Sequence, residues 1–135
     1  MLPPILHLIV WTLIIWVWMY ATRIPAMQKA SIDPQDALHP GSLSGLPSNV
    51  RTVADNYNHL HEQPTLFYAL AFWTHLYGNT DDINIALAWA YVAARIAHSL
   101  VQIVVRNVMI RFVLFVVSTL ILMGLAVRNV LALAA

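Results

Sequence analysis

Residues 51–68 read RTVADNYNHLHEQPTLFY, and this stretch decides how the rest of the chain can fold. Its first half is polar, whereas its second half opens an apolar run from Pro64 to Tyr77. The apolar run alone is too short to cross a bilayer, which takes about 20 residues. Lipid tolerates the polar half only if protein or water covers its polar side. We therefore expect a membrane helix over residues 50–77 whose polar side faces other parts of the protein.

The composition indicates an integral membrane protein. The chain has 135 residues, of which 60% are hydrophobic and 10% are charged, whereas soluble domains are about one quarter charged. The net charge of +1, without any run of basic residues, gives no reason to expect a nucleic-acid partner. Cysteine is absent, which excludes disulfides, thiolate nucleophiles and cysteine-bound metals.

Three further apolar runs predict three more membrane helices within a single domain over residues 1–135. They cover about residues 3–22, 83–105 and 107–133, and each is near the length of a membrane crossing. Residues 24–49 contain four prolines and two glycines, so we expect a loop with no long helix inside it. Pro64 should bend the second helix because it lacks a backbone N–H donor. The predicted fold is an all-α, four-helix transmembrane bundle.

The basic residues set the expected orientation. Most of them flank the first loop or the junction of the third and fourth helices: Arg23, Lys29, Arg51, Arg106 and Arg111. The turn near residues 78–82 carries two aspartates and no Lys or Arg. The positive-inside rule then places the loop at residues 24–49 in the cytoplasm and both termini outside, with Arg128 as the exception.

Helical spacing gathers polar side chains into two stripes. On the second helix, steps of four, three and four residues bring the first stripe within an arc of about 60°: Arg51, Asp55, Asn58 and Glu62. On the third helix the same spacing forms a second stripe: Tyr91, Arg95, His98, Gln102 and Arg106. Because a charged group at mid-bilayer costs about 3 kcal/mol, the stripes should face each other or a shared watery cavity. We expect Glu62 and Arg95 to form an ion pair.

Two interpretations of the stripes stay open. Interhelical polar contacts can serve only to hold helices together, or the stripes can line a ligand site. The surplus of positive groups over Asp55 and Glu62 favours an anion with carboxylates, which arginine holds through two parallel hydrogen bonds. No metal site is predicted, because His59 and His61 lie two positions apart and point about 200° away from each other on a helix.

Two segments together resemble the MAPEG superfamily, the membrane-associated proteins in eicosanoid and glutathione metabolism. They are NYNHLHEQPTLFYAL at residues 56–70 and AYVAARIAHSLVQIVVRNVMIRF at residues 90–112. The likeness spans most of residues 51–126 and is similar in particular to a small bacterial branch, whose second helix reads N-x-x-N-L-x-E-x-P-x-x-F-Y. The predicted topology and orientation agree with this resemblance.

The resemblance implies a homotrimer, expected in the bacterial inner membrane among membrane lipids, with glutathione sites between neighbouring subunits near the cytoplasmic side. It implies that Glu62 grips the amino end of the peptide. It also implies that Arg111 is the catalytic residue, since a nearby guanidinium lowers the pKa of a thiol and raises its thiolate fraction. The other expected ligand-binding residues are Arg51, Asn58, Arg95, His98 and Gln102.

Three positions depart from the family pattern. His59 replaces the asparagine three residues before Glu62, Asp55 stands where glutathione-binding members often carry arginine, and Gln102 replaces a tyrosine. Two functions therefore stay open. The first is a glutathione-dependent membrane transferase or peroxidase that attacks lipophilic electrophiles or hydroperoxides through a thiolate. The second is a non-catalytic membrane protein that binds a lipid or a partner membrane protein and uses the stripes for trimer assembly.

Overall fold

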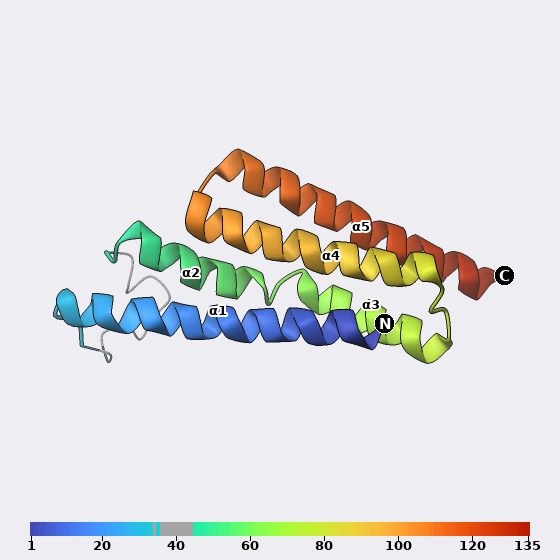
Figure 1. The fold of residues 1–135 in the computed structure, drawn as a ribbon, viewed down its shortest axis with the longest axis horizontal. Coiled ribbons are helices and arrows are strands. Elements are labelled where there is room, and N and C mark those ends of the chain that lie inside the picture. Colours follow the sequence, from blue (N-terminus) through green and yellow to red (C-terminus); the bar gives the residue numbers. More distant parts are fainter. Residues whose placement is uncertain (34, 36–44) are drawn as a thin grey trace.

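The computed structural model describes residues 1–33, 35 and 45–135, and this part of the chain is helical with short connections (Figure 1). Its elements are α1 (Leu2–Lys29), α2 (Ser48–His59), α3 (Pro64–Tyr77), α4 (Asp82–Leu100), the π-helix η2 (Val101–Val105) and α5 (Val108–Ala134). Three stretches are long and apolar enough to cross a membrane, namely Leu2–Lys29, Asp82–Val105 and Val108–Ala134. The predicted all-helical membrane protein is confirmed at this level, whereas the closed bundle and the homotrimer stay predictions.

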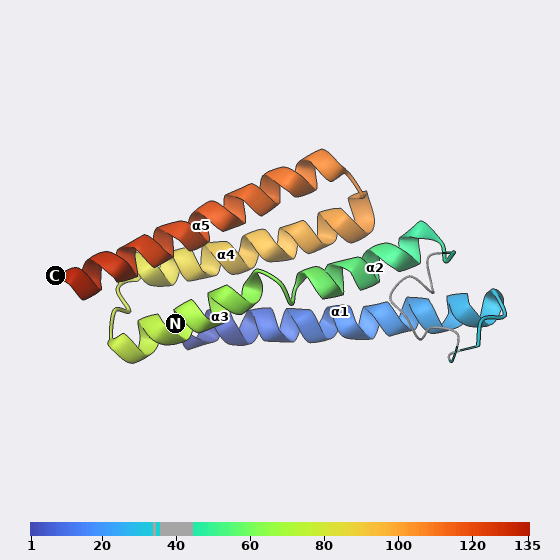
Figure 2. The same ribbon diagram turned by 180° about the vertical axis from the view of Figure 1, so that it is seen from behind.

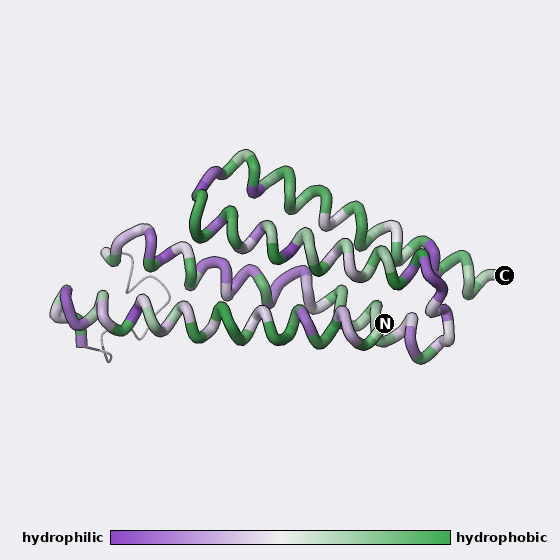
Figure 3. The backbone as a smooth tube through the Cα atoms, in the orientation of Figure 1, coloured by the Kyte–Doolittle hydropathy of each residue, from purple (hydrophilic) through white to green (hydrophobic). Residues whose placement is uncertain are grey.

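The helices lie side by side along the long axis of the molecule. Helix α1 contacts α2, α3 and α4, while α5 packs mainly on α4, and both termini lie at the same end (Figures 1 and 2). The buried core includes Leu8, Ile15, Phe67 and Leu125. Hydrophobic residues follow α1 and α5, whereas hydrophilic ones collect on α2 and at the turn between α3 and α4 (Figure 3).

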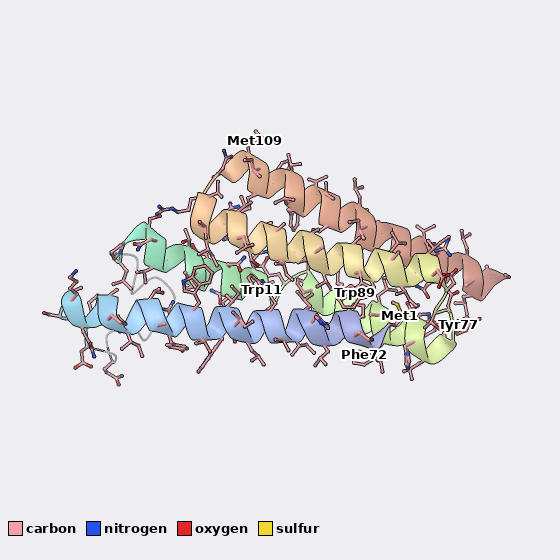
Figure 4. The ribbon with its side chains drawn as sticks, viewed as in Figure 1. Met1, Trp11, Phe72, Tyr77, Trp89 and Met109 are labelled. Carbon is pink, nitrogen blue, oxygen red and sulfur yellow. The ribbon has the colours of Figure 1, made fainter. Side chains whose placement is uncertain are left out.

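Aromatic and polar side chains join helices across this core. Trp11 lies between α1 and α4 (Figure 4), and its Nε1 donates a hydrogen bond of 3.1 Å to Ser99 Oγ on α4. Met109, by contrast, points away from the molecule near the start of α5 (Figure 4) and is exposed. The exposed apolar side chains of α1 and α5 suit a lipid or protein environment, because water would not favour so large an apolar surface.

The first helix is longer than expected. The predicted end near residue 22 and the predicted loop from residue 24 are wrong for residues 24–29, because α1 continues through Pro25 to Lys29. Proline removes one backbone hydrogen bond, but buried Met27 packs against Leu46 and Val50, and this contact favours the extra turn. Residues 34 and 36–44 of the predicted loop, including His39, lie outside the described residues.

The second predicted helix is two helices. A turn over residues 60–63 separates α2 from α3, where a bend at Pro64 was expected. Pro64 stands at the first position of α3, where the missing N–H would have no helical partner in any case. In the turn, backbone hydrogen bonds reach three residues back, from His61 N to Asn58 O and from Glu62 N to His59 O. Glu62 therefore lies outside both helices.

The third predicted helix, which is α4 followed by η2, changes pitch at its end. After α4, the π-helix η2 ends at Arg106, whose φ of 57° is left-handed and whose N–H bonds to Val101 O at 2.6 Å. Such π segments are rare and concentrate near functional sites. Asn107 then caps α5 by accepting a hydrogen bond of 3.1 Å from Ile110 N.

At the opposite end, α5 is fastened to the turn before α4. Arg128 Nη2 lies 2.5 Å from Asp81 Oδ2, and Arg128 Nε donates to Asn84 Oδ1 at 2.6 Å. Arg128 was the exception in the expected charge asymmetry. It stays an exception, because the positive-inside rule counts Lys and Arg and not the net charge, and the orientation stays a prediction.

Candidate functional site

A cavity of about 540 Å³ lies between α2, the turn after it, the end of α4 with η2, and the start of α5. Figure 1 shows these elements together at one end of the molecule, where α2 faces η2 and the first turns of α5. The volume falls within the range of small-molecule sites. The wall is made by Asp55, Asn58, His59, Glu62, His98, Gln102, Val108, Arg111, Phe112 and Phe115.

The cavity brings together most of the residues that the sequence singled out. The two stripes meet in it, and Arg111 joins them from α5; the predicted site residues in its wall are Asn58, Glu62, His98, Gln102 and Arg111. Arg51 is exposed and does not line the cavity. Arg95 is fully buried, with 0% of its surface exposed, and lies behind His59.

The expected ion pair between Glu62 and Arg95 is wrong. Within the described residues, Arg128 and Asp81 form the only ion pair within 4.0 Å. Because α2 ends at His59, Glu62 lies in the turn that follows, where its side chain is exposed and lines the cavity with Asp55 and Asn58. His59 takes its place, since Arg95 Nη2 donates a hydrogen bond of 2.6 Å to His59 Nδ1.

Arg95 bonds to an aromatic cluster that forms part of the cavity wall. The rings of His59 and His98 stack with centroids 4.7 Å apart, and Phe115 meets His59 edge-on at 5.5 Å. A guanidinium carries only donors, so Nδ1 of His59 accepts and the ring proton is on Nε2. Arg95 Nε and Nη1 and His98 Nδ1 are buried without a hydrogen-bond partner among the described residues.

Amide side chains hold the surrounding helices in place. Asn56 Nδ2 donates to Gln102 Oε1 at 2.9 Å, which joins α2 to η2. Gln63, in the turn before α3, donates to Thr119 Oγ1 at 2.8 Å and accepts from the Tyr91 hydroxyl at 3.1 Å. The turn that carries Glu62 is thereby tied to both α4 and α5.

Sequence reasoning named Arg111 but missed the apolar residues that α5 adds to the wall. Val108, Arg111, Phe112 and Phe115 recur at helical spacing and so share one face. That signal was available in the sequence, but an apolar face on a membrane helix is equally typical of a lipid contact. His59 was considered as a metal ligand and as a departure from the family pattern, but not as a partner of Arg95. Among the described residues no group of three or more His, Cys, Asp or Glu is arranged to hold a metal ion.

The wall has the features of a site for a small amphipathic molecule that carries a positive and a negative group. Glu62 and Asp55 carry carboxylates and Arg111 a guanidinium, and none of the three pairs with a described residue within 4.0 Å. A second cavity of about 190 Å³ adjoins the first through Gln102, Val108 and Arg111 and adds Arg106 to its wall. The cavity therefore offers carboxylates to an ammonium group and a guanidinium to an anion, and both lie beside apolar side chains.

Comparisons with known proteins identify the family. No curated protein and no solved structure matches the chain. The model of the MAPEG family matches residues 1–131, which is almost the whole chain. The predicted resemblance is confirmed, and the protein described here belongs to the MAPEG family of membrane proteins.

Proposed function

We propose that the protein is a glutathione-dependent membrane enzyme, a transferase or peroxidase, that acts on lipophilic electrophiles or hydroperoxides. One observation carries this proposal. Glu62 and Arg111 line the same cavity, and neither is neutralised by a described residue. Glutathione carries an ammonium group that suits Glu62 and a thiol that, as thiolate, suits Arg111. Membership of the MAPEG family supports the same ligand class.

The proposed mechanism is thiolate attack. The Arg111 guanidinium stabilises the thiolate, which raises the fraction of the reactive form at neutral pH. The sulfur attacks an electrophilic carbon to form a C–S bond. In a substitution the leaving group departs with the electron pair of its bond to that carbon, whereas in an addition to an activated C=C bond the π electrons move to the neighbouring atom, which takes up a proton. With a hydroperoxide it takes the terminal oxygen, which releases an alcohol and a sulfenic acid that a second glutathione converts to disulfide and water. Phe112 and Phe115 of α5 line the cavity and provide an apolar contact for the lipophilic part of the second substrate.

The remaining residues bind or position. Asn58, His98 and Gln102 line the cavity and supply hydrogen-bonding groups for the peptide. Arg95 holds the His59 ring through its 2.6 Å hydrogen bond and is a positioning residue in this scheme. Arg51 lies outside the cavity and has no part in it.

The binding test is calorimetry of detergent-purified protein with reduced glutathione. We expect saturable binding at millimolar concentration, and at least tenfold weaker binding by Glu62→Gln and by Arg111→Gln. Asp82→Asn and Lys29→Gln are matched controls, because each removes one charge of the same sign at an exposed position that does not line the cavity. Absence of saturable binding by the unaltered protein would overturn the proposal.

We further propose that the working form is a homotrimer in the bacterial inner membrane, with the cavity at the subunit boundary and both termini outside the cytoplasm. The exposed apolar face of α5 beside the cavity supports a contact of this kind, because a subunit placed there would cover Phe112 and Val108. The mass of the detergent-solubilised protein, corrected for detergent, should correspond to three chains. A mass of one or two chains would contradict the homotrimer.

A second candidate function is a non-catalytic protein that binds a lipid or a partner membrane protein. The observation that favours a lipid is the second carboxylate, that of Asp55, in the cavity wall, because it gives the cavity a negative charge that suits a lipid with an ammonium headgroup. Native mass spectrometry separates the two candidates. A retained lipid that millimolar glutathione does not displace favours the second function, whereas its displacement favours the first.

A further inference from the structure

Asp55 gives the cavity an excess of negative charge. Asp55 and Glu62 both line it, while Arg111 is the one guanidinium among the described residues of its wall. Arg95 does not compensate, because it is fully buried behind His59. Arg106 borders the adjoining smaller cavity instead. No described cation lies within 4.0 Å of Asp55.

Asp55 and Glu62 line the polar wall from different elements. Asp55 lies on α2, whereas Glu62 lies seven positions further along the chain, in the turn after that helix. Asp55 lies towards η2, since the neighbouring Asn56 bonds to Gln102 there. Gln102, which also lines the cavity, is uncharged and does not offset the carboxylate.

In the proposed binding mode, a thiol peptide anchored by its ammonium group on Glu62 has its far end near Asp55, because both residues line the same cavity. Glutathione ends there in the free carboxylate of its glycine, and two like charges in one cavity repel each other. We propose that Asp55 is a specificity-determining residue that favours glutathione-like thiols whose far end is neutral or positive, such as an ester, an amide or an amine conjugate. This inference rests on the proposed function and sharpens it by naming the form of the thiol.

The test compares two ligands on two proteins by calorimetry. The ligands are reduced glutathione and its glycine monoethyl ester, which differ by one negative charge at the far end. The unaltered protein should bind the ester about tenfold more tightly, a ratio that follows from a charge separation of roughly 8 Å at an effective dielectric constant between 20 and 80. The Asp55→Asn variant should bind the two ligands with affinities within about twofold of each other, because its affinity for glutathione should be about tenfold higher than that of the unaltered protein.

The design keeps the variant and its control comparable. Asn has nearly the size of Asp, and Asp55 is exposed and hydrogen-bonds to no described residue, so the substitution disturbs little packing. Asp82→Asn, at the start of α4 and away from the cavity wall, changes the net charge equally and should retain the preference for the ester. Raising the salt concentration should reduce that preference in the unaltered protein, since salt screens charges in an open site.

The outcomes separate the two proposals. Equal binding of both ligands by the unaltered protein overturns the role of Asp55 and leaves the proposed function standing. Weaker glutathione binding by Asp55→Asn overturns it as well, because Asp55 then holds a positive group of the ligand. If neither protein binds either ligand, the proposed function fails and this inference fails with it.

Discussion

Arg95→Met tests the most unusual feature of the molecule, a fully buried guanidinium without a carboxylate partner among the described residues. Its one hydrogen bond goes to a neutral histidine ring, and its Nε and Nη1 have no described partner. Methionine is unbranched and flexible, so it fills most of the same space without a charge. The substitution therefore removes the buried charge and its unpaired N–H donors, and it keeps most of the packing.

The expected magnitude follows from these contacts. Each buried donor left without a partner costs about 1–3 kcal/mol, and two such donors disappear with the guanidinium. The lost hydrogen bond to His59 had contributed about 1.5–3 kcal/mol, as is usual when one partner is charged. The balance is a stabilisation centred on about 2 kcal/mol, with a lower limit of about −1 kcal/mol. Replacement of buried charged groups by apolar ones of similar volume has raised stability by similar amounts in other proteins.

The assay is unfolding in mixed micelles by titration with sodium dodecyl sulfate, followed by the fluorescence of the five tryptophans. Arg95→Met should unfold at a higher detergent fraction than the unaltered protein. Arg95→Ala is the matched control, since it removes the same charge but leaves a cavity, and it should be less stable than Arg95→Met by about 2 kcal/mol. A destabilisation of more than about 1 kcal/mol by Arg95→Met would refute the reasoning, because the guanidinium must then be satisfied in the folded protein.

Stability and function should diverge at this position. Arg95→Met leaves His59 Nδ1 without its donor, so the ring beside the cavity loses the contact that fixes its orientation. We expect glutathione binding to weaken several-fold while the protein becomes more stable, as is common where a site retains a costly group. Calorimetry measures the weaker binding, and the micelle titration measures the gain in stability on the same preparation.

Three further substitutions test the connections between helices in the same unfolding assay. Asp81→Ala should lower the free energy of unfolding by about 1–2 kcal/mol. It removes the helix cap, in which Asp81 accepts a hydrogen bond of 2.8 Å from Asn84 N, and the partly exposed ion pair with Arg128. Concentrated salt should reduce only the contribution of the ion pair. Gly78→Ala should lower the free energy of unfolding by about 1 kcal/mol, because φ is 81° there and a side chain disfavours this conformation. No atom of the described residues beyond its chain neighbours lies within 4 Å of the added Cβ, so the loss comes from the backbone alone. Gln63→Leu removes both hydrogen bonds from the turn at residues 60–63 and should cost about 1–2 kcal/mol with faster amide exchange in that turn. An unchanged midpoint in any of the three would contradict the contact assigned to that residue.

Much of the architecture could be predicted because membrane helices follow a local rule. An apolar run of about 20 residues has to satisfy its own backbone hydrogen bonds in lipid, so its position in the sequence predicts its position as a helix. The third and fourth predicted helices therefore agree closely with Asp82–Val105 and Val108–Ala134. Helical spacing likewise predicted that Asn58 and Glu62 would share a surface with His98 and Gln102, and all four line one cavity.

The helix ends depended on packing between distant segments. A proline signals a weakened helix but does not say whether the chain bends, breaks or continues. At Pro25 the helix continues, because Met27 packs against Leu46 and Val50. At Pro64 it breaks, and Gln63 is held by contacts with α4 and α5.

The sequence by itself determined the membrane class, the helical runs, the two polar stripes and the family. Only the tertiary structure decided that Glu62 turns out of its helix, that Arg95 bonds to His59, and that α5 closes the cavity with Arg111 and Phe115. The physical reason is that helical periodicity is a property of one segment, which tells which side chains share a face. The partner of that face is set by how separate helices pack, and this depends on contacts that no single segment contains.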